Sequence, residues 1–428
     1  MAKLSCCYLS WLNKILHYWS LRRRLQRRPY TRPAWQDLVQ TLAAQPSPQD
    51  APLRHRLLLY ATIFPRLSCS FNLVEYRALL DHFPLSHCYS SGTDLHTGGD
   101  RPAFASVLSE YLRLYPQHRG RIEKAGLHAD FRAKLFYTIF LSNIHDCLPL
   151  LEARQTPFVF KLYLGGEWCV GNPGSDRMLD RVLQSPQFRH VITVDPATRD
   201  YLAEKWPQAA IRASYQPGWM VDTETLYSAG SSRNPAPSQR ICFVGMKSAP
   251  GGKNKGFDVF VETAKRLAQL MPRLEFHVVG NCDSGDADVS ELGSRIIFHG
   301  VKTQDFFPGF YAGMDLILSP NRPHLLAPGH LEGAPNVTNV EAGLCGCLVV
   351  MTDQSKLNVL FKPERDLVVV PHDPAAIVRC LQELYADPSR MSRLASQGRE
   401  RFREVCGENR ILQPLFRVLE DSLTDSAA

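Results

Sequence analysis

The chain has 428 residues, 44% of them hydrophobic, and a formal net charge of +7. This length exceeds one ordinary hydrophobic core, so it indicates two domains. The 12 cysteines are scattered, with no CxxC pair or zinc-ligand spacing. That pattern excludes a cysteine zinc module and favours buried thiols in a reducing cytoplasm. No nucleic-acid-binding motif accompanies the positive charge, so we expect no nucleic-acid partner.

The N-terminal segment 4–28 predicts an amphipathic helix. Its apolar side chains recur at helical spacing from Leu4 to Trp19, and a cluster of arginines follows them. The run is too short and too polar for a transmembrane helix, and its arginines follow the apolar part, which is the reverse of a signal peptide. Residues 1–50 are therefore interpreted as a basic extension. It either lies on the cytoplasmic face of an anionic membrane or packs on the first domain.

Residues 51–227 predict a first α/β domain, with strands expected at 56–64, 135–143, 156–166 and 188–195. Ligands of open parallel sheets gather at the carboxyl ends of the strands. The polar and glycine residues that follow these strands are the cleft candidates: His145, Asp146, Tyr163, Gly165, Gly166 and Glu167. His145 is equally well interpreted as a helix cap or an interior histidine. The segment 212–219 is a further candidate to enter the cleft.

A polar segment rich in Ser and Pro, 228–240, predicts the linker between the domains. The strand 241–245 follows and ends at Gly245, and 256–270 has the periodicity of an amphipathic helix. The loop between them carries Lys247, Lys253 and Lys255. Cations on a flexible turn suit a diphosphate, although a solvated basic loop is the alternative. The loop is not a Walker A motif, because Asn254 follows Lys253.

Further strands are expected at 274–280, 296–300, 315–320, 347–353 and 366–371, with helical segments such as 375–386 between them. This alternation predicts a second doubly wound domain over 241–409. Asp286 and Asp288 lie in a polar loop and are interpreted as a solvated turn rather than a metal site.

The segment EGAPNVTNVEAGLCG, 332–346, lies between two of these expected strands. A helix that opens near Asn336 would direct unpaired N–H groups and its positive dipole end at a diphosphate. Glu341 would then lie within reach of a ribose diol. The alternative is that Glu332 and Glu341 are solvated residues of a loop and a helix.

These motifs give residues 241–405 a resemblance to the retaining glycosyltransferases of family 4. The resemblance extends in part over residues 135–225. It implies a GT-B fold, in which two Rossmann-like doubly wound domains face a cleft and the second holds most of the donor. It also implies that the C-terminal helix, within 410–428, crosses back to the first domain.

In that family two glutamates are separated by seven residues. Glu341 matches the second, whereas eight residues separate it from Glu332, and Gly333 stands at the usual spacing. Either the turn contains one additional residue and Glu332 is the first glutamate, or Gly333 occupies that position and contributes only its backbone. Lys255 matches the family lysine that precedes a glycine. Met246 occupies the usual arginine position, which leaves Lys247 as a compensating cation.

The resemblance implies three groups of site residues. The catalytic group comprises Glu332, Lys255, His145 and Tyr163, with Tyr163 standing where many relatives have a histidine. The donor group comprises Gly245, Lys247, Lys255, Glu341, Asn339, Val340 and Gly333. The acceptor side comprises Gly165, Gly166 and Asp146.

The implied function is transfer of a sugar, with retention, from a nucleotide-sugar donor to a saccharide or lipid-linked acceptor in cell-surface glycan synthesis. The scheme requires no metal and no cofactor other than the nucleotide sugar as co-substrate. We expect a cytoplasmic protein, peripheral on the membrane through residues 4–28. Two alternatives stay open: a nucleotide-sugar epimerase of the same fold, and a degenerate scaffold that binds a partner or glycan without turnover.

Overall fold

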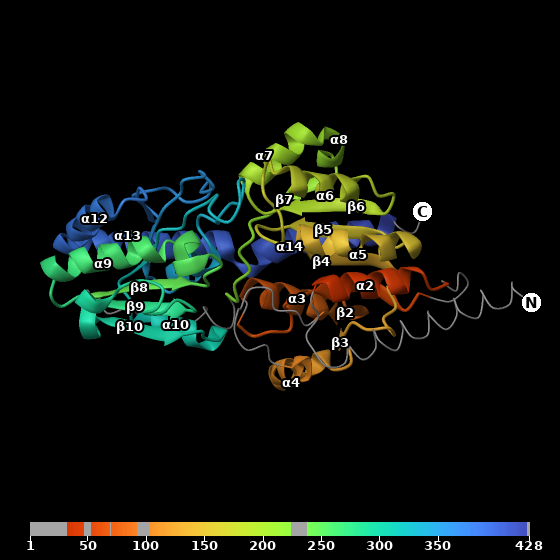
Figure 1. Cartoon of the computed structure of the whole chain (residues 1–428), viewed down its shortest axis with the longest axis horizontal. Helices are drawn as coiled ribbons and strands as arrows, with labels where there is room; N and C mark the ends of the chain where they lie inside the picture. Colours follow the sequence, from red (N-terminus) through yellow and green to blue (C-terminus); the bar gives the residue numbers. More distant parts are fainter. Residues whose placement is uncertain (1–31, 47–52, 69, 92–102, 224–237, 426–428) are drawn as a thin grey trace, which may run out of the picture.

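The computed structural model describes residues 32–46, 53–68, 70–91, 103–223 and 238–425. The predicted membrane-binding segment 4–28 and nearly all of the predicted linker 228–240 lie outside these residues. Two parallel sheets, each flanked by helices, form two domains beside one another (Figure 1). The expectation of two doubly wound α/β domains is therefore confirmed.

The first domain has seven strands in the order β3-β2-β1-β4-β5-β6-β7. The strands are β1 (His55–Ala61), β2 (Ser86–Ser90), β3 (Ile122–Lys124), β4 (Ala133–Ile139), β5 (Phe158–Leu162), β6 (Phe188–Thr193) and β7 (Ala213–Tyr215). The helices are α2 (Arg32–Ala43), α3 (Ser70–His82), α4 (Phe104–Leu114), the 3₁₀ turn η1 (Pro116–His118), α5 (Leu141–Ala153), α6 (Pro173–Leu183), α7 (Pro196–Lys205) and α8 (Pro207–Ala210).

The second domain has six strands in the order β10-β9-β8-β11-β12-β13. The strands are β8 (Arg240–Gly245), β9 (Glu275–Gly280), β10 (Ile296–Gly300), β11 (Leu316–Ser319), β12 (Leu348–Met351) and β13 (Val368–Val369). The helices are α9 (Phe257–Leu270), α10 (Phe307–Ala312), α11 (Val337–Leu344), α12 (Pro374–Ala386), α13 (Pro388–Cys406) and α14 (Glu408–Asp425), with 3₁₀ turns η2 (Pro250–Lys255), η3 (Ser290–Arg295) and η4 (Gln304–Phe306).

The last helix, α14, joins the two domains. It follows α13 of the second domain and contacts α3, β4 and β6 of the first (Figure 1). The ring of Phe416 stacks on His82 at 3.9 Å, and His82 Nε2 lies 2.8 Å from Glu420. Buried apolar residues of α14, such as Leu415 and Leu419, belong to a core that runs through both domains. This continuous apolar packing makes α14 a structural bridge.

Three predicted strands of the first domain extend too far. The expected strand 56–64 ends at Ala61, and 135–143 contains both the end of β4 and the start of α5. Phe140, with φ of 83°, turns the chain between them. Both elements are buried, so the apolar run crosses the boundary without a change of period. The expected strand 156–166 ends at Leu162, and the two glycines that follow lie in a loop at positive φ.

Among the described residues, no helix combines the length and the apolar character that crossing a bilayer requires.

Two histidines at the starts of β1 and β2 give the fold a predictable pH dependence. The rings of His55 and His87 stack with centroids 4.8 Å apart. Burial lowers the pKa of His55 to about 4, aided by His87, and lowers the pKa of His87 to about 4, aided by Arg121. Because these folded-state pKa values lie below the ordinary 6.5, the unfolded chain binds more protons between those values. Stability should therefore fall as the pH drops from about 6.5 towards about 4.

Urea unfolding at about pH 7.5 and about pH 5 measures this loss. The variant His87→Gln should lose less stability between the two conditions than the wild type. The exposed His324 offers a control, since His324→Gln should leave the difference unchanged. An unchanged pH dependence in His87→Gln would contradict this assignment.

Candidate active site

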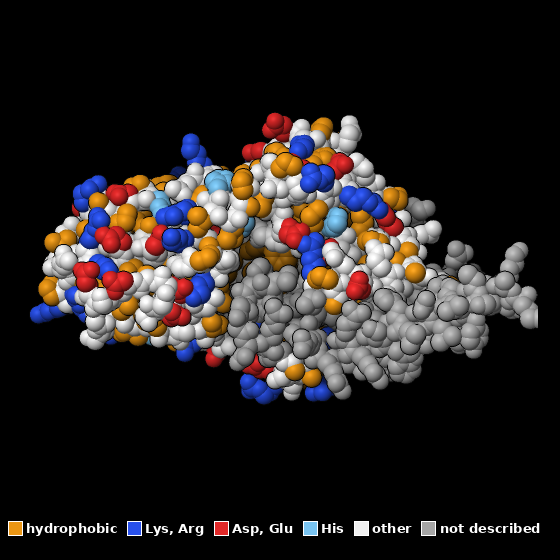
Figure 2. Space-filling model, viewed as in Figure 1, with side chains coloured by type: hydrophobic (Ala, Val, Ile, Leu, Met, Phe, Trp, Pro, Cys, Tyr) orange, Lys and Arg blue, Asp and Glu red, His pale blue; other side chains and the backbone are white. Residues whose placement is uncertain are grey.

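The face of the molecule in Figure 2 is hollowed between the two domains. A cavity of about 580 Å³ is lined by residues that follow the strands of both sheets. The first domain contributes Phe71, Phe140, Tyr163, Gly165, Gly166, Glu167 and Asp195, among others. The second contributes Gly245, Met246, Ser248, Lys255, Glu332, Gly333, Val337, Thr338 and Glu341, among others. The carboxyl ends of parallel strands thus meet at this cavity, where such sheets bind ligands.

Lys255 and Glu332 form an ion pair at the cavity wall. The lysine Nζ lies 2.5 Å from Glu332 Oε2, and Glu332 Oε1 accepts a hydrogen bond of 3.0 Å from Asn254. The Glu332 side chain is 7% exposed and that of Lys255 is 24% exposed. The cation thus keeps access to the cavity while its carboxylate partner is held from two sides. Gly333 also lines the cavity, so the structure brings both candidates for the first glutamate position to the site.

Helix α11 begins at the cavity. Asn336 caps it by accepting a hydrogen bond of 2.9 Å from the backbone N–H of Asn339, whose side chain accepts one of 3.1 Å from the N–H of Asn336. Val337 and Thr338, the first two residues of the helix, line the cavity. The positive end of the helix dipole is therefore directed at this space. Glu341 lies one turn further on and also lines the cavity, although it is only 1% exposed.

Three residues of the predicted donor group do not line the cavity. Asn339 donates a hydrogen bond of 2.6 Å to Ser319 Oγ, and Val340 is fully buried in the core. Lys247 Nζ lies 2.5 Å from Asp286 Oδ2, and this hydrogen bond raises the pKa of Lys247. Asp286 therefore does not belong to a merely solvated turn, which corrects the interpretation from the sequence. Lys247 orders the loop through this pair.

The first domain contributes an aromatic wall to the cavity. Tyr163 stacks on Phe71 with ring centroids 4.5 Å apart, and its hydroxyl donates a hydrogen bond of 3.1 Å to the carbonyl oxygen of Gly218. Gly166 has φ of +54°, and a Cβ at this position would lie 2.4 Å from Cβ of Phe140. Only glycine fits there, so the loop can pass close to the aromatic wall.

His145 and Asp146 lie outside the cavity lining. Asp146 accepts hydrogen bonds from Arg32 at 2.7 and 3.0 Å and from Gln36 at 2.9 Å, which fixes α2 on α5. Burial alone would raise the pKa of Asp146, but the hydrogen bonds from Arg32 and Gln36 and the positive charge of Arg32 outweigh it, and the pKa is lowered. The Nδ1 atom of His145 lies 3.6 Å from Asp146 Oδ1. His145 lies within α5 with a side chain that is 34% exposed, so it neither caps the helix nor lines the cavity.

Three further residues, His330, Asp195 and Trp219, line the cavity. Burial lowers the pKa of His330, although the charge of Glu332 opposes the shift. Asp195 caps α7 through a hydrogen bond of 2.7 Å from the N–H of Thr198, and burial raises the pKa of this carboxyl. Trp219 donates a hydrogen bond of 2.8 Å to the carbonyl oxygen of Pro335, across the domain interface. The sequence indicated two of these positions: Asp195 at the end of an expected strand, and Trp219 within the segment 212–219 that was a candidate to enter the cleft.

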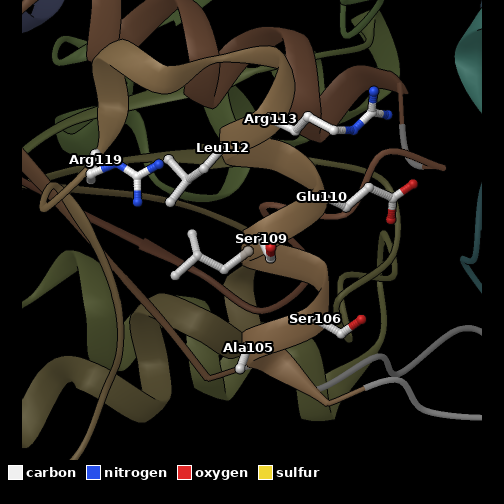
Figure 3. A pocket seen from close by; sticks show the side chains of 8 residues that line it. Ala105, Ser106, Ser109, Glu110, Leu112, Arg113 and Arg119 are labelled. Carbon is white, nitrogen blue, oxygen red and sulfur yellow. The ribbon is translucent and has the colours of Figure 1, made fainter.

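A second, more open hollow of about 900 Å³ lies on α4 (Figure 3). It is lined by one side of that helix, including Ser106, Ser109, Glu110 and Arg113, and by Arg119. None of the residues predicted to act in chemistry lies there. We therefore assign the site to the cavity between the domains.

Within the part of the chain that the structure describes, no three His, Cys, Asp or Glu side chains are grouped closely enough to hold a metal ion.

Comparison with known proteins identifies the second domain. A family model described as Glycosyl transferases group 1 matches residues 238–387. The resemblance to glycosyltransferases found in the sequence is thereby confirmed over these residues, at the level of group 1. No curated protein sequence matches the chain.

Solved structures of similar shape cover both domains. Sucrose-phosphate synthase from Thermosynechococcus elongatus superposes with a TM-score of 0.60 at 14% identity, over 87% of this chain and 100% of that one. Anabaena HepE in complex with UDP and glucose gives 0.61 at 15% identity, over 86% and 100%. The α,α-trehalose 6-phosphate synthase from Burkholderia multivorans gives 0.56 at 11%, over 87% and 98%. These likenesses show the fold, and the GT-B expectation is confirmed.

Proposed function

We propose that this protein is a retaining glycosyltransferase that moves a sugar from a nucleotide-sugar donor to a saccharide or lipid-linked acceptor. The observation that carries the proposal is the cavity between the domains. Lys255, the start of α11 and Glu341 all line it from the side of the group 1 domain. A cation and a helix N-terminus are complementary to a diphosphate, and a carboxylate is complementary to a ribose diol. Anabaena HepE, which shares the fold, was solved in complex with UDP and glucose, and a ligand of this class agrees with the proposal.

In the proposed reaction, the bond between the anomeric carbon and the diphosphate oxygen breaks as the sugar becomes oxocarbenium-like. The acceptor oxygen bonds to the same face of that carbon, and its proton passes to an oxygen of the departing phosphate. Lys255 and the first turn of α11 stabilise the charge that develops on the diphosphate. Glu332 holds Lys255 in place, and the stacked pair Phe71 and Tyr163 borders the acceptor side. This scheme uses positioning and charge rather than a metal ion.

Glu341→Ala should weaken nucleotide binding by about tenfold or more, because a hydrogen bond to a charged group contributes about 1.5–3 kcal/mol. Thermal-shift titration with UDP-, GDP- and ADP-sugars measures the loss. Glu291→Ala is a matched control, since Glu291 is also in the second domain but does not line the cavity. A titration curve identical to that of the wild type would remove Glu341 from the donor site.

Product analysis tests the reaction itself. Purified protein is incubated with each nucleotide sugar, with EDTA or magnesium, and with or without a panel of saccharide acceptors. We expect an acceptor-dependent product that retains the anomeric configuration of the donor, formed equally in EDTA. Conversion of the nucleotide sugar without any acceptor would instead identify an epimerase. Absence of both binding and consumption would favour a scaffold.

A further inference from the structure

Asn254 immediately precedes Lys255 in the 3₁₀ turn η2, on the loop between β8 and α9. Its side chain is almost completely buried, with the residue 1% exposed. Its neighbours Ser248 and Lys255 line the cavity, whereas Asn254 does not. Any effect of Asn254 on the donor must therefore act through these neighbours.

The side-chain amide of Asn254 makes hydrogen bonds in two directions. Its Oδ1 accepts from the backbone N–H groups of Ser248, at 3.2 Å, and Ala249, at 3.0 Å. Its Nδ2 donates to Glu332 Oε1 at 3.0 Å. Backbone N–H groups require an acceptor and a carboxylate requires a donor, so the two partners fix the orientation of the amide. No acidic side chain can replace it, because a carboxylate cannot donate.

The backbone of Asn254 is anchored as well. Its carbonyl oxygen accepts a hydrogen bond of 2.9 Å from the N–H of Arg322, in the loop after β11. One buried residue therefore connects the 246–249 turn, the carboxylate of Glu332 and the loop after β11. Glu332 in turn holds Lys255 through its second oxygen, at 2.5 Å.

We propose that Asn254 is a positioning residue of the donor site, which orients the Lys255–Glu332 pair and the 246–249 turn towards the diphosphate of the nucleotide. The inference rests on the proposed function, because Asn254 would pre-organise the same cavity that is proposed to bind the donor. Holding Glu332 from one side by Asn254 and from the other by Lys255 leaves the carboxylate a single orientation. Groups fixed before the ligand arrives cost less free energy to order on binding.

Asn254→Asp is the first test variant, because it preserves shape and keeps an acceptor for Ser248 and Ala249. It places a second carboxylate against Glu332, so the pair should be displaced. The exchange variant Asn254→Asp/Glu332→Gln restores the contact with the roles reversed. The new amide at position 332 donates to the new carboxylate at 254, and its oxygen still accepts from Lys255. Net charge then equals that of the wild type.

Calorimetric titration with UDP, GDP and ADP provides the readout, since these probes carry the diphosphate that the Lys255–Glu332 pair and the 246–249 turn are proposed to face. The wild type should bind one of them. Asn254→Asp should weaken that affinity by about tenfold or more, and the exchange variant should recover most of the loss. Asn143→Asp is the matched control. Asn143 is 5% exposed and its amide donates a hydrogen bond of 2.7 Å to the carbonyl of Ile139, away from the donor loop.

Asn143→Asp should lower the melting temperature without changing the nucleotide affinity. The inference is overturned if Asn254→Asp binds as tightly as the wild type, whatever its melting temperature, or if the exchange variant binds as weakly as the single one. Failure of the wild type to bind any of the three nucleotides would overturn the proposed function together with this inference. The two failures are therefore distinguishable.

Discussion

Lys255→Ala should lower kcat/KM by about a hundredfold or more while the protein remains folded. Removal of one pre-organised group that stabilises transition-state charge costs about 10²–10³ in rate. The substitution also leaves Glu332, whose side chain is 7% exposed, without its ion-pair partner. Steady-state kinetics with the donor that the wild type uses, together with circular dichroism, measure the effect. Lys255→Arg should retain part of the activity because it retains the charge.

The matched control for this prediction is Lys253→Ala. Lys253 lies two residues away in the same loop, but its side chain is exposed and does not line the cavity. Its removal should change kcat/KM by less than about twofold, as is typical of a screened surface charge. A folded Lys255→Ala variant with the kinetics of the control would contradict the assignment of Lys255 to the diphosphate.

Lys161→Met should produce a large loss of stability in the first domain. Lys161 is completely buried on β5 and forms an ion pair with Glu75 of α3, which also accepts a hydrogen bond from the hydroxyl of Tyr137. Removing one partner of a buried pair leaves an uncompensated charge, at a cost of about 3–5 kcal/mol. Urea unfolding monitored by circular dichroism measures the difference in the free energy of unfolding.

Replacing all three side chains of the cluster, Glu75, Tyr137 and Lys161, distinguishes the cost of an unpaired buried charge from the cost of losing the contact. The triple variant Glu75→Leu/Tyr137→Phe/Lys161→Met should recover most of the stability, since buried ion pairs contribute little beyond what apolar packing provides. Lys205→Met is the control, because Lys205 pairs with Asp176 at 2.5 Å but its side chain is 41% exposed. It should lose much less stability than Lys161→Met. A triple variant no more stable than the single one would refute this explanation.

The sequence predicted the second domain better than the first. Strands such as β8 and β9 have short apolar runs between clear loop signals, and α9 has regular helical periodicity, so their limits came within a residue or two. In the first domain, β4 and α5 are both buried, and the apolar run 135–143 does not reveal that the chain turns at Phe140. Periodicity marks a boundary only where one side of an element faces solvent.

The part of the candidate site whose residues are close together in the sequence could be predicted. Glu332, Gly333 and Glu341 lie in one segment, and the motif alone placed them together. The pairs Lys255–Glu332 and Lys247–Asp286 connect residues far apart in the chain, so no spacing rule predicts them. The role of Asn254 could not be predicted for the same reason, because its side-chain amide donates to Glu332, 78 residues away in the chain. His145 follows an expected strand in the sequence, but the chain turns into α5 at Phe140, and the structure places His145 in this helix, outside the cavity lining.

The most direct test of the proposed donor site is calorimetric titration of the wild type with UDP, GDP and ADP in the presence of EDTA. We predict that one nucleotide binds without metal and that its binding is lost or severely weakened in Lys255→Ala. If no nucleotide binds, or if Lys255→Ala binds as tightly as the wild type, the cavity between the domains is not the donor site proposed for it.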